Sequence, residues 1–588
     1  MRKPRRYPRA VSFAVRHFLL LVPVLFALTL VACDGDAPTT STVSTTATFN
    51  VSTTTCQNAD NRTFRRVALT DHAAVWADDR NPTPTLTDAE YQAIADSFEA
   101  VVWPTNTRVF GQPSDVDGNG RVHILYTTAV NALSPQSSSA YIGGFYFARD
   151  LFPRTAGAFN GVTFSSGSTC ATSNQGEFFY MLAPDENGTI NSNVRTRSQV
   201  RHVTLGTLAH EFQHLINASI RVYRSGAYYE DTWLDEGLSH IAEELAFYNA
   251  GASQPLQNYD LNAIRASEAR RLAFNRTMSQ NTTRFNAYLQ KGPTTSPYDT
   301  NDSLATRGGA WALLRYLADR KGGDQEAFFR TVAQSGVQGM ASIQRGLGGV
   351  DPYPYLNGFH LSAFADDKVA TAASLQQPSW NFRDVLTLYG GYGVTTFPLT
   401  AGVTKRVTVD GGGTALLPVG VGPLAEGTVR VGEAGVLPVG TCTTGAERVT
   451  LAVGEAKTFA AGPAAMCLVG GTTGAEFVLS AVHASPAPSR DPNTGDEPDN
   501  ERLTLHALAT NTTPVTLSSA FAGASPSLNL SAAEQAEAAT EAASRAIEMD
   551  IRRRERTLVL PGNRMRPSFN RLGAAGINSL VVSVLRTK

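Results

Sequence analysis

An apolar repeat of helical period across residues 199–220 constrains the fold of this 588-residue chain more than any other feature. Its apolar positions fall on one helical face, at Val200, Val203, Leu208, Phe212, Leu215 and Ile216. The segment contains no proline, so we predict one uninterrupted helix with a buried face. The chain is long enough for about three or four domains, and therefore for a core of the size that such a helix needs.

The centre of this helix carries the sequence HEFQH at residues 210–214. Histidines four residues apart project from one helical face, so the imidazoles of His210 and His214 can reach the same metal ion. Imidazole and carboxylate ligands with an open position suit zinc, which lowers the pKa of its bound water to about 7. We therefore predict a zinc site in which Glu211 is the general base. The alternative is a surface helix with two solvated histidines, although Phe212 fits a buried face.

A catalytic zinc ion needs a third protein ligand, and Glu236 is the candidate. It lies in the segment WLDEGLS at residues 233–239, at the start of a second expected helix over residues 232–248. Here the sequence resembles the gluzincin group of zinc peptidases, in which a glutamate on the helix after HExxH completes the site. The metzincin pattern HExxHxxGxxH is absent, because Asn217 and Ile220 stand where its glycine and third histidine would be.

The layout of these two helices resembles the hyicolysin family of neutral metallopeptidases in particular. The resemblance covers about residues 70–370 and includes DVDGNG at 115–120, GGFYF at 143–147, AEE at 242–244 and RGGAW at 307–311. It implies a multidomain protein with an α+β, zincin-like (thermolysin-like) catalytic domain. Such a domain would hydrolyse peptide bonds of protein or peptide substrates through a zinc-activated water.

Gluzincin-like folds place an edge strand before the active helix, where it pairs with the substrate backbone. By chain order, residues Gly143 to Phe147 are the candidate, and further short strands are expected at 121–126 and 177–182. A third helix is expected over residues 304–320. Such pairing would recognise the main chain of the substrate through backbone hydrogen bonds, so we expect an endopeptidase with loose sequence preference.

Other polar residues are candidates for supporting roles around the metal. His240 lies four residues after Glu236 on the same helical face, where it could orient a ligand through a hydrogen bond. Related gluzincins carry an acid in that position, so a helix histidine without a metal role is the alternative. A second electrophile should stabilise the oxyanion of the tetrahedral intermediate. Spacing does not choose among its five candidates, which are Tyr223, Tyr228, Tyr229, Tyr298 and Arg307.

A group of acidic and amide side chains upstream of the helix suggests a second cation. Asp115, Asp117 and Asn119 stand at positions 1, 3 and 5 of a calcium loop. Position 12 is Tyr126 instead of a glutamate, which excludes an EF-hand. Two interpretations follow, a looser calcium site or a tight turn that enters the next strand.

The N-terminus has the layout of a bacterial export signal. Residues 1–17 carry six basic residues and no acid, and residues 18–31 are almost wholly apolar. This apolar run is too short for a membrane-spanning helix, which needs about 20 residues. The segment LVAC ending at Cys33 resembles the lipobox of bacterial lipoproteins, and it implies a signal peptide over residues 1–32 and a lipid anchor on Cys33. An ordinary secretory signal is the alternative.

A lipid anchor would hold the protein in the bacterial cell envelope, on the periplasmic or cell-surface face of a membrane. Changes in composition then divide the remaining chain. We expect a Thr/Ser-rich tether at 33–57, a zinc metallopeptidase domain at 58–375, a β-sandwich-like domain at 376–484, a linker at 485–500 and a β-rich segment at 501–588 with an Ala-rich helix at 531–556.

Four cysteines remain after Cys33, and outside the cytoplasm we expect them to pair. Proximity favours a bond between Cys442 and Cys467, which leaves Cys56 with Cys170, one of three connectivities.

The near balance of 50 basic and 51 acidic residues argues against a nucleic-acid partner, and we expect a monomer. The alternative function is an inactive, zinc-containing surface lipoprotein that acts as an adhesin or binding module through its C-terminal β-domains. The intact Glu211 argues against it.

Overall fold

The computed structural model describes residues 45–397, apart from residues 55, 139–140, 226–228, 300–301 and 369, and beyond them residues 412–413 and the strands β9 to β17. The predicted signal peptide and Cys33 therefore lie outside the described residues. Among the residues that are described, no helix has the length and apolar character that crossing a membrane requires.

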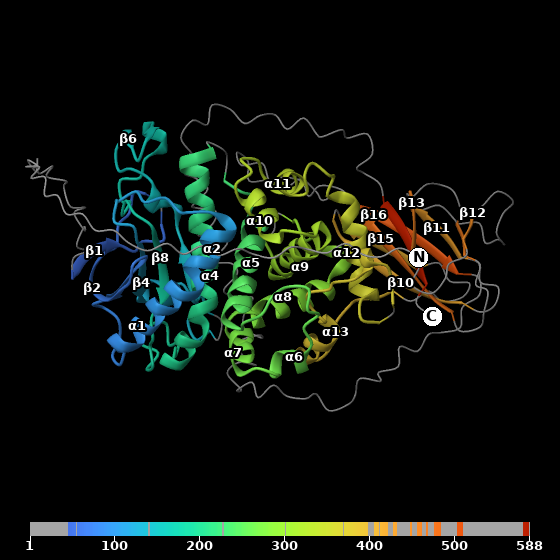
Figure 1. The fold of residues 1–588 in the computed structure, drawn as a ribbon, viewed down its shortest axis with the longest axis horizontal. Coiled ribbons are helices and arrows are strands. Elements are labelled where there is room, and N and C mark those ends of the chain that lie inside the picture. The colour runs from blue at the N-terminus through green and yellow to red at the C-terminus, as the bar shows by residue number, and fades with distance from the viewer. Residues whose placement is uncertain are drawn as a thin grey trace, which may run out of the picture. The chain divides into compact units, whose positions relative to one another are not determined.

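The N-terminal part is built on a six-stranded mixed sheet with the order β1-β2-β3-β4-β8-β5 (Figure 1). The strands are β1 Thr46–Asn50, β2 Asn61–Leu69, β3 Ala73–Asp78, β4 Val122–Thr127, β8 Phe178–Leu182 and β5 Gly144–Tyr146. The three central strands β3, β4 and β8 run parallel and are buried on both faces, as continuous apolar runs predict. The edge strand β5 pairs antiparallel with β8, so the strands expected near 121–126, 143–147 and 177–182 are all present.

The expected tether needs a correction, because part of it belongs to the sheet. Residues Thr46–Asn50 form β1, which pairs antiparallel with β2 from Thr46 opposite Arg65 to Asn50 opposite Asn61. The threonine-rich composition that suggested a flexible segment also suits a strand, since threonine is β-branched. A disulfide between Cys56 and Cys170 follows, as predicted.

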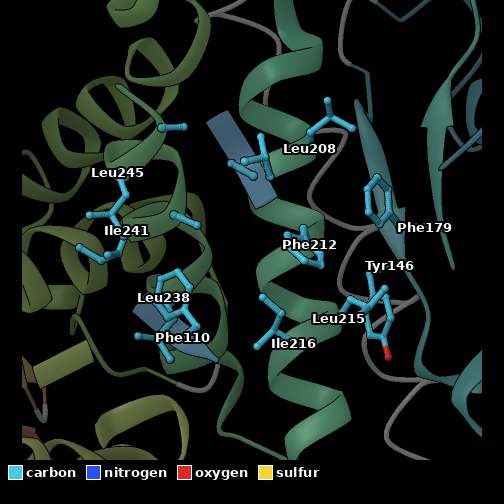
Figure 2. Close-up of a cluster of buried hydrophobic side chains, with 14 of the residues drawn as sticks. Phe110, Tyr146, Phe179, Leu208, Phe212, Leu215, Ile216, Leu238, Ile241 and Leu245 are labelled. Atoms are coloured by element: carbon cyan, nitrogen blue, oxygen red, sulfur yellow. The ribbon is translucent and has the colours of Figure 1, made fainter. Parts of the chain in front are cut away.

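The helix α4, Arg197–Ile220, lies between the sheet and the second helix α5, Thr232–Ala250 (Figure 2). Its N-terminus is fixed by a capping box in which Thr196 and Gln199 exchange hydrogen bonds. Phe212 of α4 is fully buried, with Phe179 of the sheet on one side and Leu238 of α5 on the other. Because α4 is covered from both sides, its buried surface is wider than the single stripe that the sequence suggested.

Two further helices complete the surroundings of α5. These are α8 Ser279–Leu289 and α9 Leu304–Lys321. A Cβ atom on Gly308 would lie 2.2 Å from the backbone of Arg284, so glycine is required where α8 and α9 touch. The other helices are α1 Asp88–Ser97, α2 Trp103–Phe110, α3 Thr128–Asn131, α6 Leu261–Arg265, α7 Glu268–Thr277, α10 Gln325–Ala333, α11 Gly339–Gly346, α12 Tyr353–Ala365 and α13 Phe382–Val385. Trp380 and Phe382 are buried in the same core, so this body continues past the expected boundary at residue 375.

The C-terminal part is described as strands, and its β-rich character is confirmed. The strands are β9 Lys405–Asp410, β10 Thr414–Val421, β11 Gly427–Val431, β12 Glu447–Val449, β13 Ala456–Ala460, β14 Met466–Leu468, β15 Ala475–His483, β16 Arg502–Ala509 and β17 Leu580–Arg586. β16 pairs with β9 and β11, and β17 with β13 and β15. The expected linker at 485–500 lies outside the described residues. The helix at 531–556 and the cysteine Cys442 lie outside the described residues.

Candidate metal centre

Three ligand atoms converge between α4 and α5. Nε2 of His210 and Nε2 of His214 are 3.1 Å apart. The carboxylate of Glu236 lies 3.3 Å from the first nitrogen and 3.7 Å from the second. All three side chains are buried, and together they form a group that could hold a metal ion. The structure thus brings together the three residues that the sequence proposed as ligands.

The second nitrogen of His210 is held by an acid that the sequence analysis did not single out. Nδ1 of His210 donates to Oε1 of Glu243 at 2.7 Å, and this leaves Nε2 to face the other ligands. Burial alone would raise the pKa of Glu243, but hydrogen bonds from His240 and His210 outweigh burial and lower it to about 2. Glu243 is therefore an ionised acceptor that fixes the tautomer of His210.

His214 has an equivalent arrangement. Its Nδ1 lies 3.0 Å from Oδ2 of Asp235 and 3.1 Å from the hydroxyl of Ser239. That hydroxyl donates to Gln213 at 2.6 Å, so its oxygen is oriented to accept from the imidazole. The other Asp235 oxygen accepts from Asn217 at 2.7 Å. Both histidines consequently have one nitrogen engaged with the protein and the other turned towards the site.

Glu236 is held by an arginine. Nη1 of Arg307 lies 3.0 Å from Oε2 of Glu236, and Nε and Nη2 of Arg307 donate to the two oxygens of Asp302, each at 2.8 Å. Arg307 is 1% exposed. Arg307 is one of the expected candidates for the oxyanion, whereas in the structure it lies against the carboxylate of the candidate ligand Glu236.

His240 lies beside the three ligands without joining them. Its Nδ1 donates to Glu243 at 2.9 Å, and its Nε2 accepts from Nη1 of Arg284 at 2.7 Å. Burial lowers the pKa of His240 to about 4, so the ring is neutral. Its centroid is 4.8 Å from that of His210. His240 therefore packs against His210 and shares Glu243 as its hydrogen-bond acceptor.

The electrostatics of the group suit a cation. Burial would lower the pKa of His210, but the carboxylates of Glu236, Glu243 and Glu211 raise it to about 10. The protein without metal therefore draws a proton into this site, and a divalent ion would satisfy the same carboxylates more fully. Glu211 is buried beside His210 on α4, where it could meet a water on the ion. These residues fit zinc.

The tyrosine candidates for the oxyanion lie in surroundings that differ from one tyrosine to the next. The hydroxyl of Tyr223 donates to the carbonyl of Leu151, which directs it to the backbone. Tyr298 is buried between the rings of Trp233 and Tyr353, and Tyr229 is partly buried against the core. Tyr228 lies outside the described residues. The assignment of the oxyanion group stays a prediction.

The candidate calcium residues form a different cluster from the expected one. Asp115 and Asp117 come together with the buried Glu177, which the sequence analysis did not name. The amide of Asn119 donates to Asp117 at 2.6 Å. Ser114 and the backbone N–H of Val116 donate to Glu177. These local hydrogen bonds match the turn interpretation, and calcium stays a prediction.

Five residues around the metal group were missed by the sequence analysis. They are Asp235, Ser239, Glu243, Arg284 and Asp302. The helical period carried a signal for Glu243, because positions 236, 240 and 243 fall on one face of a helix. No sequence pattern connects Arg284 or Asp302 to α5, since they lie 34 and 52 residues beyond its end at Ala250.

The mixed α/β body thus contains a buried helix that presents two histidines towards a glutamate of the next helix, and these three residues form a candidate His/His/Glu metal centre. No family model matches the chain. Over 175 residues, 29% of this chain, the sequence is 29% identical to the neutral metalloprotease ShpI of Staphylococcus hyicus. The match spans 33% of the length of that protein, so the chain resembles a neutral metalloprotease over part of its length.

Proposed function

We propose that this protein is an extracytoplasmic zinc metallopeptidase, and specifically an endopeptidase. The convergence of His210, His214 and Glu236 beside Glu211 carries the proposal. The similarity to a neutral metalloprotease over 29% of the chain also supports it. The binding-module alternative has no comparable support, because it gives Glu211 no task.

In the proposed mechanism His210, His214 and Glu236 would hold the zinc ion. When bound, zinc supplies a Lewis acid that acidifies a water and polarises the scissile carbonyl. Glu211 takes the proton of the attacking water and later delivers it to the leaving amine. Glu243 and Asp235 keep the two imidazoles in the orientation and tautomer that ligation needs.

The edge strand β5 is the proposed binding strand for the substrate backbone. Within the described part of the chain β5 pairs with β8 alone. Cβ atoms on Gly143 and Gly144 would lie 2.8 Å from the side chain of Thr207, so these glycines let the strand lie close to α4. Thr207 precedes His210 by one turn, which places the strand near the site. Backbone pairing there would accept many sequences, as an endopeptidase requires.

The proposed location rests on the N-terminal sequence and on the disulfide. A bond between Cys56 and Cys170 is typical of proteins outside the cytoplasm. We propose that the mature chain begins at Cys33 with a lipid anchor and acts as a monomer. Mass spectrometry of the N-terminal peptide from membrane fractions tests the anchor, and an unmodified N-terminus at another residue would contradict it.

The experiment for the function compares wild type with Glu211→Gln. Both proteins should bind one zinc ion per chain, and only wild type should cleave casein, with loss of that cleavage when a chelator is added. The glutamine variant keeps the size of the side chain but cannot accept the proton. Equal cleavage by folded Glu211→Gln protein would exclude the proposed mechanism.

A further inference from the structure

The interface of α5 with α9 contains two buried arginine–glutamate pairs with the same spacing. Arg307 contacts Glu236 at 3.0 Å, and Arg315 contacts Glu244 at 3.6 Å. In each pair the residues are 71 positions apart, so the pairs lie eight residues apart on both helices. Only the first pair includes a residue of the metal group.

Each arginine also has an aspartate of its own neighbourhood as a partner. Asp302, just before α9, binds Nε and Nη2 of Arg307, and Asp319 lies 3.0 Å from Arg315 one turn further along α9. All of these side chains are buried, and a buried arginine must be paired to be tolerated. The bidentate contact with Asp302 orients the guanidinium and leaves Nη1 of Arg307 3.0 Å from Oε2 of Glu236.

The backbones of the two helices approach each other at this point. A Cβ atom on Gly237 would lie 3.2 Å from the Cβ atom of Ala310 and 2.9 Å from the side chain of Leu314. Glycine beside Glu236 therefore allows the close contact that brings Arg307 within reach. The planar guanidinium can bind two carboxylates in fixed directions, which a lysine ammonium cannot do.

We propose that Arg307 is a positioning residue that fixes the carboxylate of Glu236 for metal binding, and that Asp302 fixes Arg307. This inference rests on the proposed zinc site. It replaces the expectation that Arg307 stabilises the oxyanion, because its guanidinium nitrogens contact Glu236 and Asp302. Without Arg307 the Glu236 carboxylate could rotate, and the ion would lose a ligand that is already in place.

The test compares Arg307→Met with the matched control Arg315→Met in the full-length protein. Both variants remove one buried arginine from the same face of α9, and both should lower the unfolding temperature of the metal-free protein. Only Arg307→Met should change the visible absorption of the Co²⁺-loaded protein and weaken zinc binding, by roughly tenfold to 100-fold in a chelator competition.

Two results would overturn the proposal. If the arginine only offset the negative charge of the site, Arg307→Met would bind zinc more tightly than wild type. If its role were only structural, Arg307→Met and Arg315→Met would leave the Co²⁺ spectrum equally unchanged. Should Arg307→Met fail to fold, Asp302→Asn provides the second variant, since it keeps the arginine and weakens its anchor. It should shift the spectrum in the same direction, and an unchanged spectrum would count against the proposal.

The failure of the proposed function is distinguishable from the failure of this inference. If the zinc affinity of wild type is no higher than that of His210→Ala, the metallopeptidase proposal itself fails. If wild type binds zinc and cleaves casein while Arg307→Met keeps the wild-type spectrum and affinity, only the positioning role is wrong.

Discussion

Oε1 of Glu243 accepts a hydrogen bond from Nδ1 of His210 at 2.7 Å, although the two residues lie on different helices. The same oxygen accepts from His240 at 2.9 Å. Residues three or four positions apart lie on one face of a helix, so positions 240 and 243 of α5 face the same way. Glu243 can therefore reach His210 even though position 240 holds a histidine. The metal group therefore depends on α5 through Glu243 as well as through Glu236.

Replacing Glu243 should weaken metal binding. In Glu243→Gln the acceptor loses its charge, and zinc affinity should fall by roughly tenfold to 100-fold. Glu244→Gln is the control, because Glu244 is buried next to it but contacts Tyr248 and Trp380 instead of a ligand. Chelator competition measures both affinities. Equal losses in the two variants would show that Glu243 acts only through the packing of α5.

Replacing Glu211 should separate metal binding from catalysis. Removal of a general base costs about 100-fold to 10,000-fold in rate. Glu211→Gln should lose at least that much of kcat on a fluorogenic peptide, with its zinc content unchanged. The control is the double variant Glu211→Gln/Gln213→Glu, which places an acid two residues away on the same helix. This double variant should stay inactive. Restored activity would mean that the position of the base is not specific.

The stability of the protein should depend on Glu177 below neutral pH. Burial raises the pKa of Glu177 from 4.5 to about 7, so the folded protein binds more protons than the unfolded chain between these values. The free energy of unfolding therefore falls as the pH rises through about 4.5 to 7, by roughly 3 kcal/mol at most. Glu177→Gln should flatten this part of the profile in urea unfolding. An unchanged profile would assign the pH dependence to other groups.

The same variant tests calcium. If Asp115, Asp117 and Glu177 hold the ion, excess calcium should raise the free energy of unfolding of wild type at pH 8 and leave Glu177→Gln unaffected. If calcium has no effect on either protein, the turn interpretation of residues 115–120 holds.

Reduction of the disulfide should destabilise the sheet region. The bond between Cys56 and Cys170 joins residues 114 positions apart and ties the segment after β1 to the body. Closing a loop of this length contributes about 2–5 kcal/mol, largely through the unfolded chain. The double variant Cys56→Ser/Cys170→Ser should unfold at correspondingly lower urea concentration. Wild type in the presence of a reducing agent should also unfold at a lower urea concentration. If the double variant and the reduced protein both unfold like oxidised wild type, the disulfide does not stabilise the protein.

The sequence was sufficient for the elements whose signal is local. Helical period and proline content predicted α4 and α5, and the spacing within HEFQH predicted that His210 and His214 would share a face. Signals of composition were less reliable. The threonine-rich tether contains β1, and strands beyond the expected linker pair with strands before it. Composition describes what a segment is made of, whereas pairing depends on strands that lie far away in the chain.

The contacts that complete the site depend on tertiary structure. The chain alone determined two histidines, a glutamate base and a candidate third ligand, because these follow from spacing along two helices. Only the packing of α5 against α4 and α9 decided that Glu243 would hold His210 and that Arg307 would hold Glu236. The reason is physical, since hydrogen bonds and ion pairs act over a few ångströms in space whatever the separation in sequence.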